Sequence, residues 1–297
     1  MLGEHRPDLA AELHPNDEGP TPWDSPTLLP TRDGIEDTAR LLLPPQPRPQ
    51  RWQPFTLSPL GTPVQPRAHG STTLRITSVH HGLSDWLGGL EAEDFGSIRL
   101  GRVDPVDLRV LTILKDAEQD PWAGASSWQD LVARWTTPRR VSSLVRLDFL
   151  TPTTFRKASG HRRWNVVFPT PEEVLGSLAE KWEAFAPLRL RFASNVDLEG
   201  AVMASRYQLE SCYLTDGGFP AKGFHGRCEY RTAKDADDVT TRVVHVLIDF
   251  AFYAGIGSMT TMGMGQVWPS HLADPTLRPY RTRRRTESTA SMPTDSS

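Results

Sequence analysis

The stretch VTTRVVHVLIDFAFYAGIGSMTTMGMGQVW, residues 239–268, joins an apolar run to a loop that is rich in glycine. The apolar run predicts a largely buried helix, and the end of the stretch predicts a last strand. Between them stand two Gly-x-Gly pairs, Gly255 with Gly257 and Gly263 with Gly265. Glycine permits positive φ and lets another backbone approach closely. The sequence therefore predicts a tight helix-to-strand loop with something pressed against it.

Several interpretations of this loop can be compared. A tight turn without a ligand would explain two glycines. Four glycines with Ser258, Thr260 and Thr261 between them favour a backbone-lined cradle for an anion or for RNA. A nucleotide-binding enzyme is the weakest interpretation, because the loop follows a helix rather than a first strand. It also lacks the third glycine of a dinucleotide fingerprint and the Gly-Lys-Ser/Thr of a Walker loop.

Length and composition set wide limits. The chain has 297 residues, of which 38% are hydrophobic, enough for two domains with real cores. It contains no apolar run of 18 residues and starts without a secretion signal, so we expect a cytoplasmic protein without a membrane span. Cys212 and Cys228 fit a reducing compartment, although a disulfide between them stays open. No Cys/His set has zinc spacing, and we expect neither a metal site nor a cofactor.

The net charge of −3 argues weakly against a nucleic-acid partner, but the charge is unevenly distributed. Residues 139–163 carry seven basic side chains and a single acidic one, Asp148. A local patch of this sign can hold phosphates even on an acidic protein. The alternative is a solvated basic face without a ligand.

The composition and the hydrophobic pattern of the chain change near residue 71. The first 70 residues hold 14 of the 26 prolines, and residues 15–50 show no sustained periodicity, which is typical of a long loop or a disordered insertion. From residue 71 a strand is expected at 71–80 and a short amphipathic helix at 82–93. Strand material broken by Pro105 follows, and then a second short helix at 126–135 with Ser126 or Ser127 as its N-cap.

The second half shows a recognisable order of elements. We expect a strand at 141–150, a loop at 151–164, a helix at 169–185, two strands, the buried helix and the last strand. Strand, helix, two strands, helix, strand is the ferredoxin-like order. The first half shows the later part of the same order. The fold class is therefore α+β, with two ferredoxin-like (RRM-like) domains in tandem.

Four stretches, taken in order, resemble one family. They are PFTLSPL (54–60), LDFLTPTTFRKASG (147–160) followed by FPTPEEVLGSLAEKW (168–182), GFHGRCEY (223–230), and the glycine-rich loop itself. The set is similar to the CRISPR-associated (Cas) family-six endoribonucleases, RAMP proteins that cut the repeat in precursor CRISPR RNA. The resemblance implies metal-independent cleavage in which the RNA 2′-hydroxyl attacks the adjacent phosphate. This reaction leaves a 2′,3′-cyclic phosphate and a 5′-hydroxyl, and the protein can retain the product.

The resemblance also sets domain boundaries. Residues 1–138 are expected to form the first domain, which lacks its N-terminal strand and carries the proline-rich insertion at 15–50. Residues 139–270 form the second domain, with the glycine-rich loop. Residues 271–297, basic and then Ser/Thr-rich, are expected to be a disordered tail.

The resemblance points to a catalytic histidine. In many members a short helix ends in Leu-His shortly before the Pro-Phe-Thr-x-Ser strand, and DLAAELHP (8–15) places His14 in that pattern. Histidine suits proton transfer because its pKa lies near working pH. The alternative is a histidine placed favourably at a helix C-terminus. The long segment between His14 and Pro54 departs from the family pattern and leaves the position of His14 open.

The other histidines have competing roles. His80 and His81 fit a capping or exposed role, and His245 fits core packing. His161 and His225 are further candidates for contact with RNA. Phe155 and Trp164 could stack on bases or belong to the core. Met259, Met262 and Met264 are expected to pack the loop against its domain.

The expected partner is CRISPR repeat RNA. The proposed contacts are the loop residues and three basic residues: Gly255, Gly257, Ser258, Thr260, Gly263, Gly265, Arg156, Lys157 and Arg163. The alternative function is a non-catalytic RAMP subunit that binds CRISPR RNA in an effector complex. Further partners left open are Cas subunits of such a complex and a second copy of the chain.

Overall fold

A computed structural model describes most of the chain between residues 42 and 272. The described ranges are 42–43, 52–60, 72–100, 106–137, 140–159, 162–190, 200–214 and 221–272. The predicted helix that ends at His14, the predicted absence of a first strand and residues 273–297 of the predicted C-terminal tail lie outside these residues. So does most of the proline-rich insertion, although Leu42–Leu43 (β1) pairs with Arg189–Leu190 (β9). The first two residues of the predicted tail, His271 and Leu272, end a short 3-10 helix, so the prediction of disorder is wrong for them.

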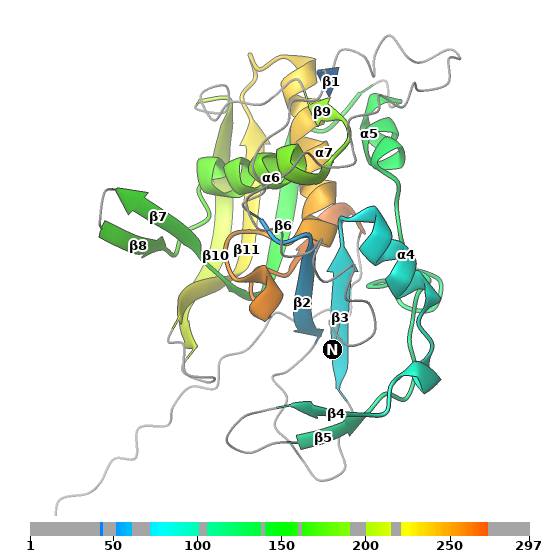
Figure 1. Cartoon of the computed structure of the whole chain (residues 1–297). Helices are drawn as coiled ribbons and strands as arrows, with labels where there is room; N and C mark the ends of the chain where they lie inside the picture. Colours follow the sequence, from blue (N-terminus) through cyan, green and yellow to red (C-terminus); the bar gives the residue numbers. More distant parts are fainter. Residues whose placement is uncertain are drawn as a thin grey trace, which may run out of the picture.

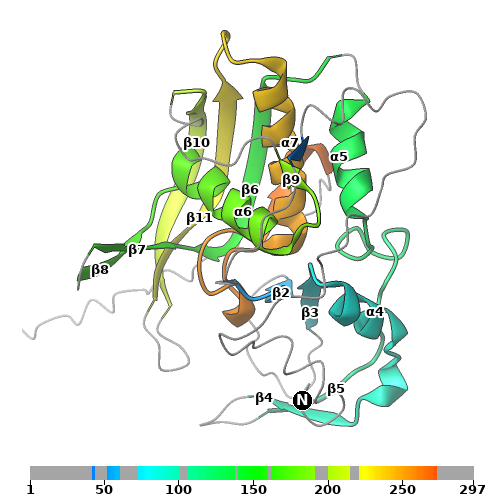
Figure 2. The ribbon, with the colours of Figure 1, turned by 45° about the horizontal axis from the view of Figure 1, so that its top comes forward.

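The second half confirms the predicted order of elements. In chain order they are β6 (Leu144–Thr153), α6 (Pro171–Phe185), β10 (Val202–Leu214), β11 (Ala221–Thr232), α7 (Asp238–Ala254) and β12 (Val267–Pro269). The strands form one antiparallel sheet in the order β10-β11-β6-β12, and α6 and α7 cover one of its faces (Figures 1 and 2). The first and third strands of the unit lie in the middle of this sheet, as the ferredoxin-like order requires.

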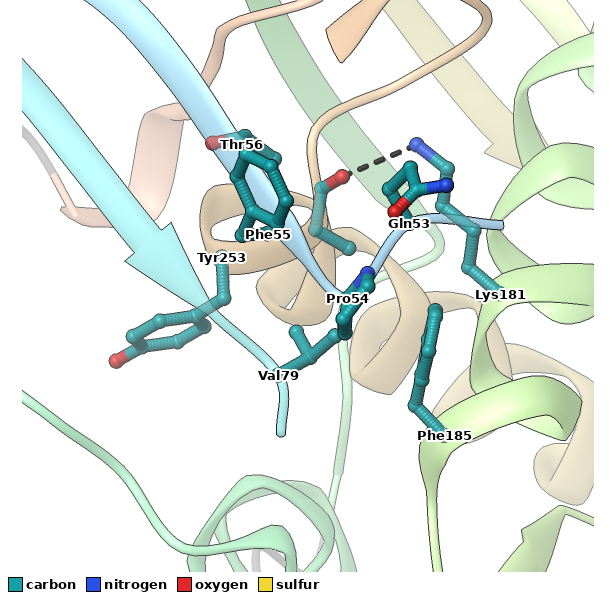
Figure 3. Close-up of a pocket in the computed structure, with 9 residues that line it drawn as sticks. Gln53, Pro54, Phe55, Thr56, Val79, Lys181, Phe185 and Tyr253 are labelled. Atoms are coloured by element: carbon teal, nitrogen blue, oxygen red, sulfur yellow. Dashed lines mark hydrogen bonds between the residues drawn. The ribbon is translucent and has the colours of Figure 1, made fainter. Parts of the chain in front are cut away.

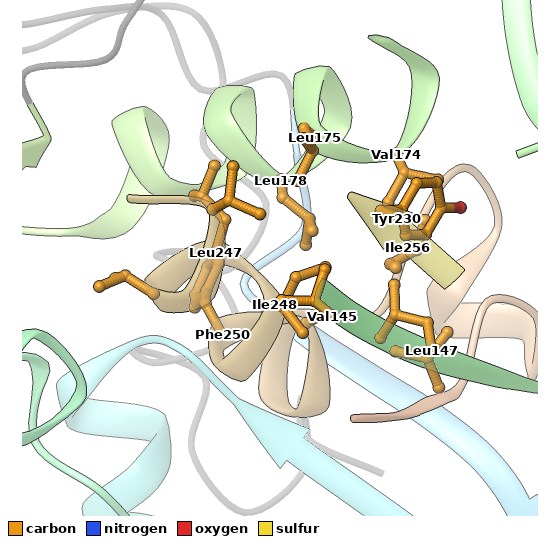
Figure 4. Packing of buried hydrophobic residues seen from close by; sticks show 14 of the residues in the cluster. Val145, Leu147, Val174, Leu175, Leu178, Tyr230, Leu247, Ile248, Phe250 and Ile256 are labelled. Carbon is orange, nitrogen blue, oxygen red and sulfur yellow. The ribbon is translucent and has the colours of Figure 1, made fainter. Parts of the chain in front are cut away.

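The core lies between this sheet and its two helices. Alternate residues of β6, namely Val145, Leu147 and Phe149, are buried, and they meet Leu178 of α6 and Ile248 of α7 (Figure 4). Burying one such side chain stabilises a fold by about 1.5–3 kcal/mol. Eleven residues of α7 are buried, because α5 and the strands of the first half cover the sides that the sheet and α6 leave open.

Three helices begin where the sequence places capping residues. The side chains of Ser127, Thr170 and Asp237 each accept a hydrogen bond from the backbone N–H three residues later. Such caps satisfy N–H groups that a helix leaves unpaired at its start. Pro171 at the first position of α6 adds a preset φ.

The first half contributes a hairpin followed by a helix. Strands β2 (Phe55–Leu60) and β3 (Thr73–Ser78) pair antiparallel, and α4 (His81–Gly89) and the short 3-10 helix η1 (Ala92–Asp94) follow. A second pair, β4 (Ser97–Leu100) with β5 (Val106–Arg109), and α5 (Trp128–Thr136) complete this half. Tandem ferredoxin-like domains are consistent with these elements. The boundary near residue 138 stays a prediction, because α5 packs into the same core as α7.

The prediction of a loop at residues 151–164 is wrong. β6 extends to Thr153, and Phe155–Ser159 (β7) pairs with Arg162–Val166 (β8) as a hairpin that projects from the body (Figure 1). The register sets Phe155 opposite Val166 and Lys157 opposite Trp164. Charged residues hid this strand pattern, because neither face of the hairpin reads as continuously apolar.

Two smaller observations complete the fold. Within the described ranges, no helix has both the length and the apolar character needed to cross a membrane. Cys212 and Cys228 are both buried free thiols, so the disulfide left open by the sequence is absent.

Candidate nucleic-acid interface

The glycine-rich loop folds against the chain's own backbone. Gly257 and Gly265 have φ values of 73° and 72°, which residues other than glycine rarely adopt. A Cβ on Gly257 would come within 3.0 Å of the Thr154 carbonyl oxygen, and one on Gly265 within 3.0 Å of the Ile256 carbonyl oxygen. The group pressed against these glycines is therefore the backbone of Thr154, between β6 and β7, and of the loop itself.

Several of the loop's N–H groups are used internally. The amide of Ile256 donates to Gly265 O at 2.8 Å, that of Ser258 to Thr154 O at 2.9 Å, and that of Gly265 to Pro152 O at 3.0 Å. Bonds of this length satisfy the donor, so these amides do not point toward a ligand. The loop is thus a rigid support rather than an open nest of N–H groups.

A different set of loop atoms reaches the surface. Ser258, Thr261 and Gly263 are half-buried, whereas Gly255, Gly257, Thr260 and Gly265 are buried. Thr260 opens a short 3-10 helix, η3 (Thr260–Met262), which packs beside β2. Met264 is buried as expected, but Met262 is 56% exposed, so the expected packing role fails for Met262.

The end of the loop is tied to the first half of the chain. Gln266 Oε1 accepts hydrogen bonds from Ser58 Oγ at 2.9 Å and from Arg75 NH1 at 3.1 Å. The Arg75 side chain is 6% exposed, and it also donates to the carbonyl oxygens of Trp122 and Phe252, both at 2.8 Å. Burial lowers the pKa of Arg75 to about 9. Sequence reasoning missed this contact, because nothing local marks an arginine in a strand as buried.

A shallow pocket lies beside the start of the loop (Figure 3). Gln53, Phe55 and Thr56 line it from the β2 side, and Tyr253 and Lys181 line it from α7 and α6. Lys181 Nζ donates to the carbonyl oxygens of Ala254 and Gly255, both at 3.0 Å. Burial lowers the pKa of Lys181 to about 7. This buried lysine was also missed, since α6 reads as an ordinary amphipathic helix.

The β7–β8 hairpin starts next to the glycine-rich loop in space. Thr154 precedes β7, and its carbonyl oxygen holds the amide of Ser258. Arg156 and Lys157 are exposed on β7, and Trp164 on β8 is 48% exposed. Lys157 Nζ lies 2.6 Å from Glu173 Oε1 on α6. Phe155 is buried in the core and is not available for stacking.

Arg163 lies on β8 opposite Ala158. Residues 155–166 carry four basic side chains and no acidic one. This hairpin carries part of the basic patch of the sequence. Its first strand starts beside the glycine-rich loop, which lies about a hundred residues further along the chain, because Ser258 N donates to Thr154 O.

The described histidines are mostly structural. His80 caps α4 by accepting from the amide of Leu83, and His81 pairs with Asp85 at 2.7 Å, as the sequence predicts. His245 is buried and stacks on Trp135, which confirms a packing role. His14 and His161 lie outside the described residues.

His225 on β11 is buried, with 4% of its surface exposed. Its Nε2 lies 4.0 Å from Glu210 Oε2 on β10. Burial lowers the pKa of His225, and the neighbouring carboxylate of Glu210 opposes that shift. Direct contact of this imidazole with RNA would require the surrounding strands to open.

A buried acid holds α5 to α7. Asp249 is 1% exposed, and its Oδ2 accepts from Arg134 NH1 at 2.7 Å and from Trp135 Nε1 at 2.9 Å. His271, in the short 3-10 helix η4 (Ser270–Leu272), forms an ion pair with Asp249 Oδ1. Within the described ranges, no group of three or more His, Cys, Asp or Glu side chains is arranged to hold a metal ion.

The family model described as CRISPR-associated endoribonuclease Cas6 matches residues 147–267, from β6 to the first residue of β12. This segment of the chain is therefore similar to the Cas6 family. Curated relatives are the CRISPR-associated endoribonucleases Cas6 of two Mycobacterium tuberculosis strains, each 28% identical over 135 residues. The alignment covers 43% of this chain and 39% of each relative, so the chain matches about two fifths of their length.

Solved Cas6 structures match over a longer stretch. A product complex of Thermus thermophilus Cas6 is 25% identical, with a TM-score of 0.63, over 90% of this chain and 88% of that one. A substrate-mimic complex of another Cas6 is 28% identical, with a TM-score of 0.57, over 73% and 85%. A histidine-to-alanine variant of that second protein is 26% identical, with the same TM-score. The likeness supports the tandem ferredoxin-like architecture.

Proposed function

We propose that this chain is an endoribonuclease that processes precursor CRISPR RNA by cutting within the repeat. The observation that carries the proposal is the Cas6 match over residues 147–267, because this segment contains both the glycine-rich loop and the basic hairpin. Similar Cas6 proteins have been solved with a reaction product and with a substrate mimic. A basic surface beside a rigid loop suits a folded polyanion.

The proposed chemistry needs no metal ion. The RNA 2′-hydroxyl attacks the adjacent phosphorus, the bond to the 5′-oxygen breaks, and the products carry a 2′,3′-cyclic phosphate and a 5′-hydroxyl. One group must remove the 2′-proton, and one must protonate the departing 5′-oxygen. We assign proton transfer to His14, on the family pattern in the sequence. Cations or N–H groups near the phosphate would offset the charge that develops on it.

The proposed RNA contacts divide into two kinds. Arg156, Lys157 and Arg163 on the hairpin would contact phosphates, and the exposed Trp164 offers a surface on which a base could stack. In the loop, Ser258 and Gly263 reach the surface, and these two are the proposed direct contacts.

Four other loop residues, Gly255, Gly257, Thr260 and Gly265, are buried. We propose that they act by shaping the loop. The same surface would retain the product after cleavage.

The test is incubation of the purified chain with CRISPR repeat RNA in EDTA, beside the variant His14→Ala. The matched control is His81→Ala, which removes an exposed histidine on α4. We expect cleavage at one site by the wild type and by His81→Ala, with a cyclic phosphate end, and none by His14→Ala. Cleavage that survives His14→Ala would contradict the role of His14 and leave the enzyme in place.

Tight binding without cleavage would favour the other candidate, a non-catalytic RNA-binding subunit. The same surface supports this candidate, since binding requires only the loop and the hairpin. A chain that neither binds nor cuts the repeat would contradict both functions.

A further inference from the structure

The last carbonyl groups of α7 are all held by side chains from other elements. Phe252 O accepts from Arg75, Tyr253 O accepts from Thr77 Oγ1 at 2.5 Å, and Ala254 O accepts from Lys181. Lys181 also holds Gly255 O, the first carbonyl of the loop. Helices normally leave these final carbonyls without a partner within the helix. The point where the glycine-rich loop starts is therefore fixed from two sides, by β3 and by α6.

Two of these donors are buried cations. Arg75 and Lys181 are 6% and 2% exposed, and within the described ranges no carboxylate forms an ion pair with either. Their positive charges are offset by carbonyl dipoles at the negative end of α7, and the nearby carboxylate of Asp120 also favours the charged form of Arg75. A neutral side chain would have packed here at a lower desolvation cost, because an unpaired buried charge is expensive. We therefore expect the buried positive charges of Arg75 and Lys181 to have a role.

We infer that Lys181 is a positioning residue that fixes the start of the glycine-rich loop and makes RNA affinity depend on its charge. This inference rests on the proposed function. With the ammonium protonated, its charge lies 3.0 Å from the first carbonyl oxygen of the loop and favours a phosphate bound at the loop. The neutral amine keeps hydrogen bonds to the carbonyls but loses that attraction.

The surroundings of Lys181 are suited to such a role. Its pKa of about 7, lowered by burial, places its loss of charge near neutral pH. From the β2 side, the uncharged Trp52 and Gln53 face it, and the Trp52 ring lies 5.2 Å from Nζ.

The other titratable groups around Lys181 are few. Tyr253 lines the same pocket from α7, and burial raises its pKa further. Glu180 and Glu183 flank Lys181 on its own helix, at spacings that point away from it.

The direction of the effect follows from linkage. A bound phosphate stabilises the protonated lysine and raises its pKa, so RNA binding takes up a proton near neutral pH. The gain in RNA affinity is complete below the pKa that Lys181 has in the free protein. It is lost as the pH rises through that value toward the pKa of the complex.

The experiment measures the affinity for repeat RNA between pH 6 and pH 9 at constant ionic strength. The chain is compared with Lys181→Met and Lys181→Arg, after a check of folding by thermal unfolding. Wild-type affinity should fall about three- to tenfold more across this range than that of Lys181→Met. Lys181→Arg stays charged and should match the low-pH wild type with a flat profile. If Lys181 had a purely structural role, Lys181→Met would lower the RNA affinity by the same factor at every pH.

Each outcome decides one question. The same pH profile in the wild type and in both variants overturns this inference and leaves the proposed function standing. No binding by the wild type at any pH overturns the proposed function, and this inference with it. Should Lys181→Met fail to fold, Lys181→Arg still decides, because a profile as steep as that of the wild type contradicts the inference.

Discussion

The glycine-rich loop and the β7–β8 hairpin lie side by side but are built on opposite principles. Most of the loop's glycines are buried, several of its amides are bonded to the chain, and its conformation depends on glycine at particular positions. The hairpin has a two-stranded ladder of its own and exposes charged side chains. We propose that in RNA binding the loop supplies shape and the hairpin supplies exposed positive charge. Substitutions should therefore damage the two regions in different ways.

The largest effect is expected from a side chain in the loop. Gly265→Ala places a Cβ against the Ile256 carbonyl oxygen at a left-handed φ, and it should cost about 3 kcal/mol or more of the free energy of unfolding. Denaturant unfolding measures this loss. Gly200→Ala is the matched control, because its φ is 84° but nothing lies within 4 Å of the new Cβ. Equal, small losses in both variants would contradict the close approach.

The hairpin should behave in the opposite way. Arg156→Gln combined with Lys157→Gln should leave the free energy of unfolding unchanged and weaken RNA binding about tenfold at physiological salt. The slope of log affinity against log salt should fall by about 1.4 for single-stranded contacts. Filter binding across a salt series measures both quantities.

Lys234→Gln is the control for that pair. Lys234 is exposed before α7, a 17-residue helix that rises about 25 Å to the loop. Its removal should change neither the affinity nor the salt slope by as much. An unchanged slope in the double variant would remove these two residues from the interface.

A smaller effect is expected from the acid that pairs with Lys157. Glu173→Gln removes the partner that lies 2.6 Å from Lys157 Nζ, so the lysine becomes free for a phosphate. RNA affinity should rise about two- to threefold, since an ion pair at this exposure is weak. Glu172→Gln, an exposed neighbour, removes the same charge without freeing Lys157. Equal gains in both variants would mean that only net charge matters.

The smallest effect concerns pH and separates stability from binding. Burial lowers the pKa of His245, and the charge of His271 lowers it further, while the Ser142 carbonyl and Asp249 oppose the shift. The unfolded chain then binds a proton that the folded chain does not, so stability falls as the pH drops below about 6.5. The rise in RNA affinity should come earlier in the same titration, because Lys181 becomes charged as the pH falls through about 7.

Denaturation midpoints at pH 7.5 and pH 5.5 test the first half of this statement. His245→Gln should show a smaller decline than the wild type, whereas His81→Gln, at an exposed site, should show the wild-type decline. A wild-type midpoint that rises on acidification would contradict the assignment.

The fold was largely predictable because its signals are local. Thr170 with Pro171 marks the start of α6, and the alternation of Val145, Leu147 and Phe149 marks a strand with one buried face. The β7–β8 hairpin was not predictable in this way, since Arg156, Lys157 and Arg163 interrupt any apolar pattern. The basic residues identified the hairpin segment as a candidate RNA-binding surface, but they also hid the alternation that would have predicted its two strands.

The site was predictable only in part, for a similar reason. Four glycines announce a tight loop, but the sequence cannot say whether a ligand or the chain itself presses against them. The Thr154 carbonyl comes from another part of the second half, and the Ile256 carbonyl comes from the loop itself. Arg75 and Lys181 bind carbonyl groups far away in sequence, and no spacing rule reports such contacts.

Hydrogen exchange with and without repeat RNA tests the division between shape and charge most directly. In the free protein the amides of Ile256, Ser258 and Gly265 should already exchange slowly, because each is bonded to a carbonyl of the chain. RNA should slow exchange mainly in residues 155–166. Fast exchange of the three loop amides in the free protein, slowed by RNA while the hairpin stays unchanged, would contradict the account.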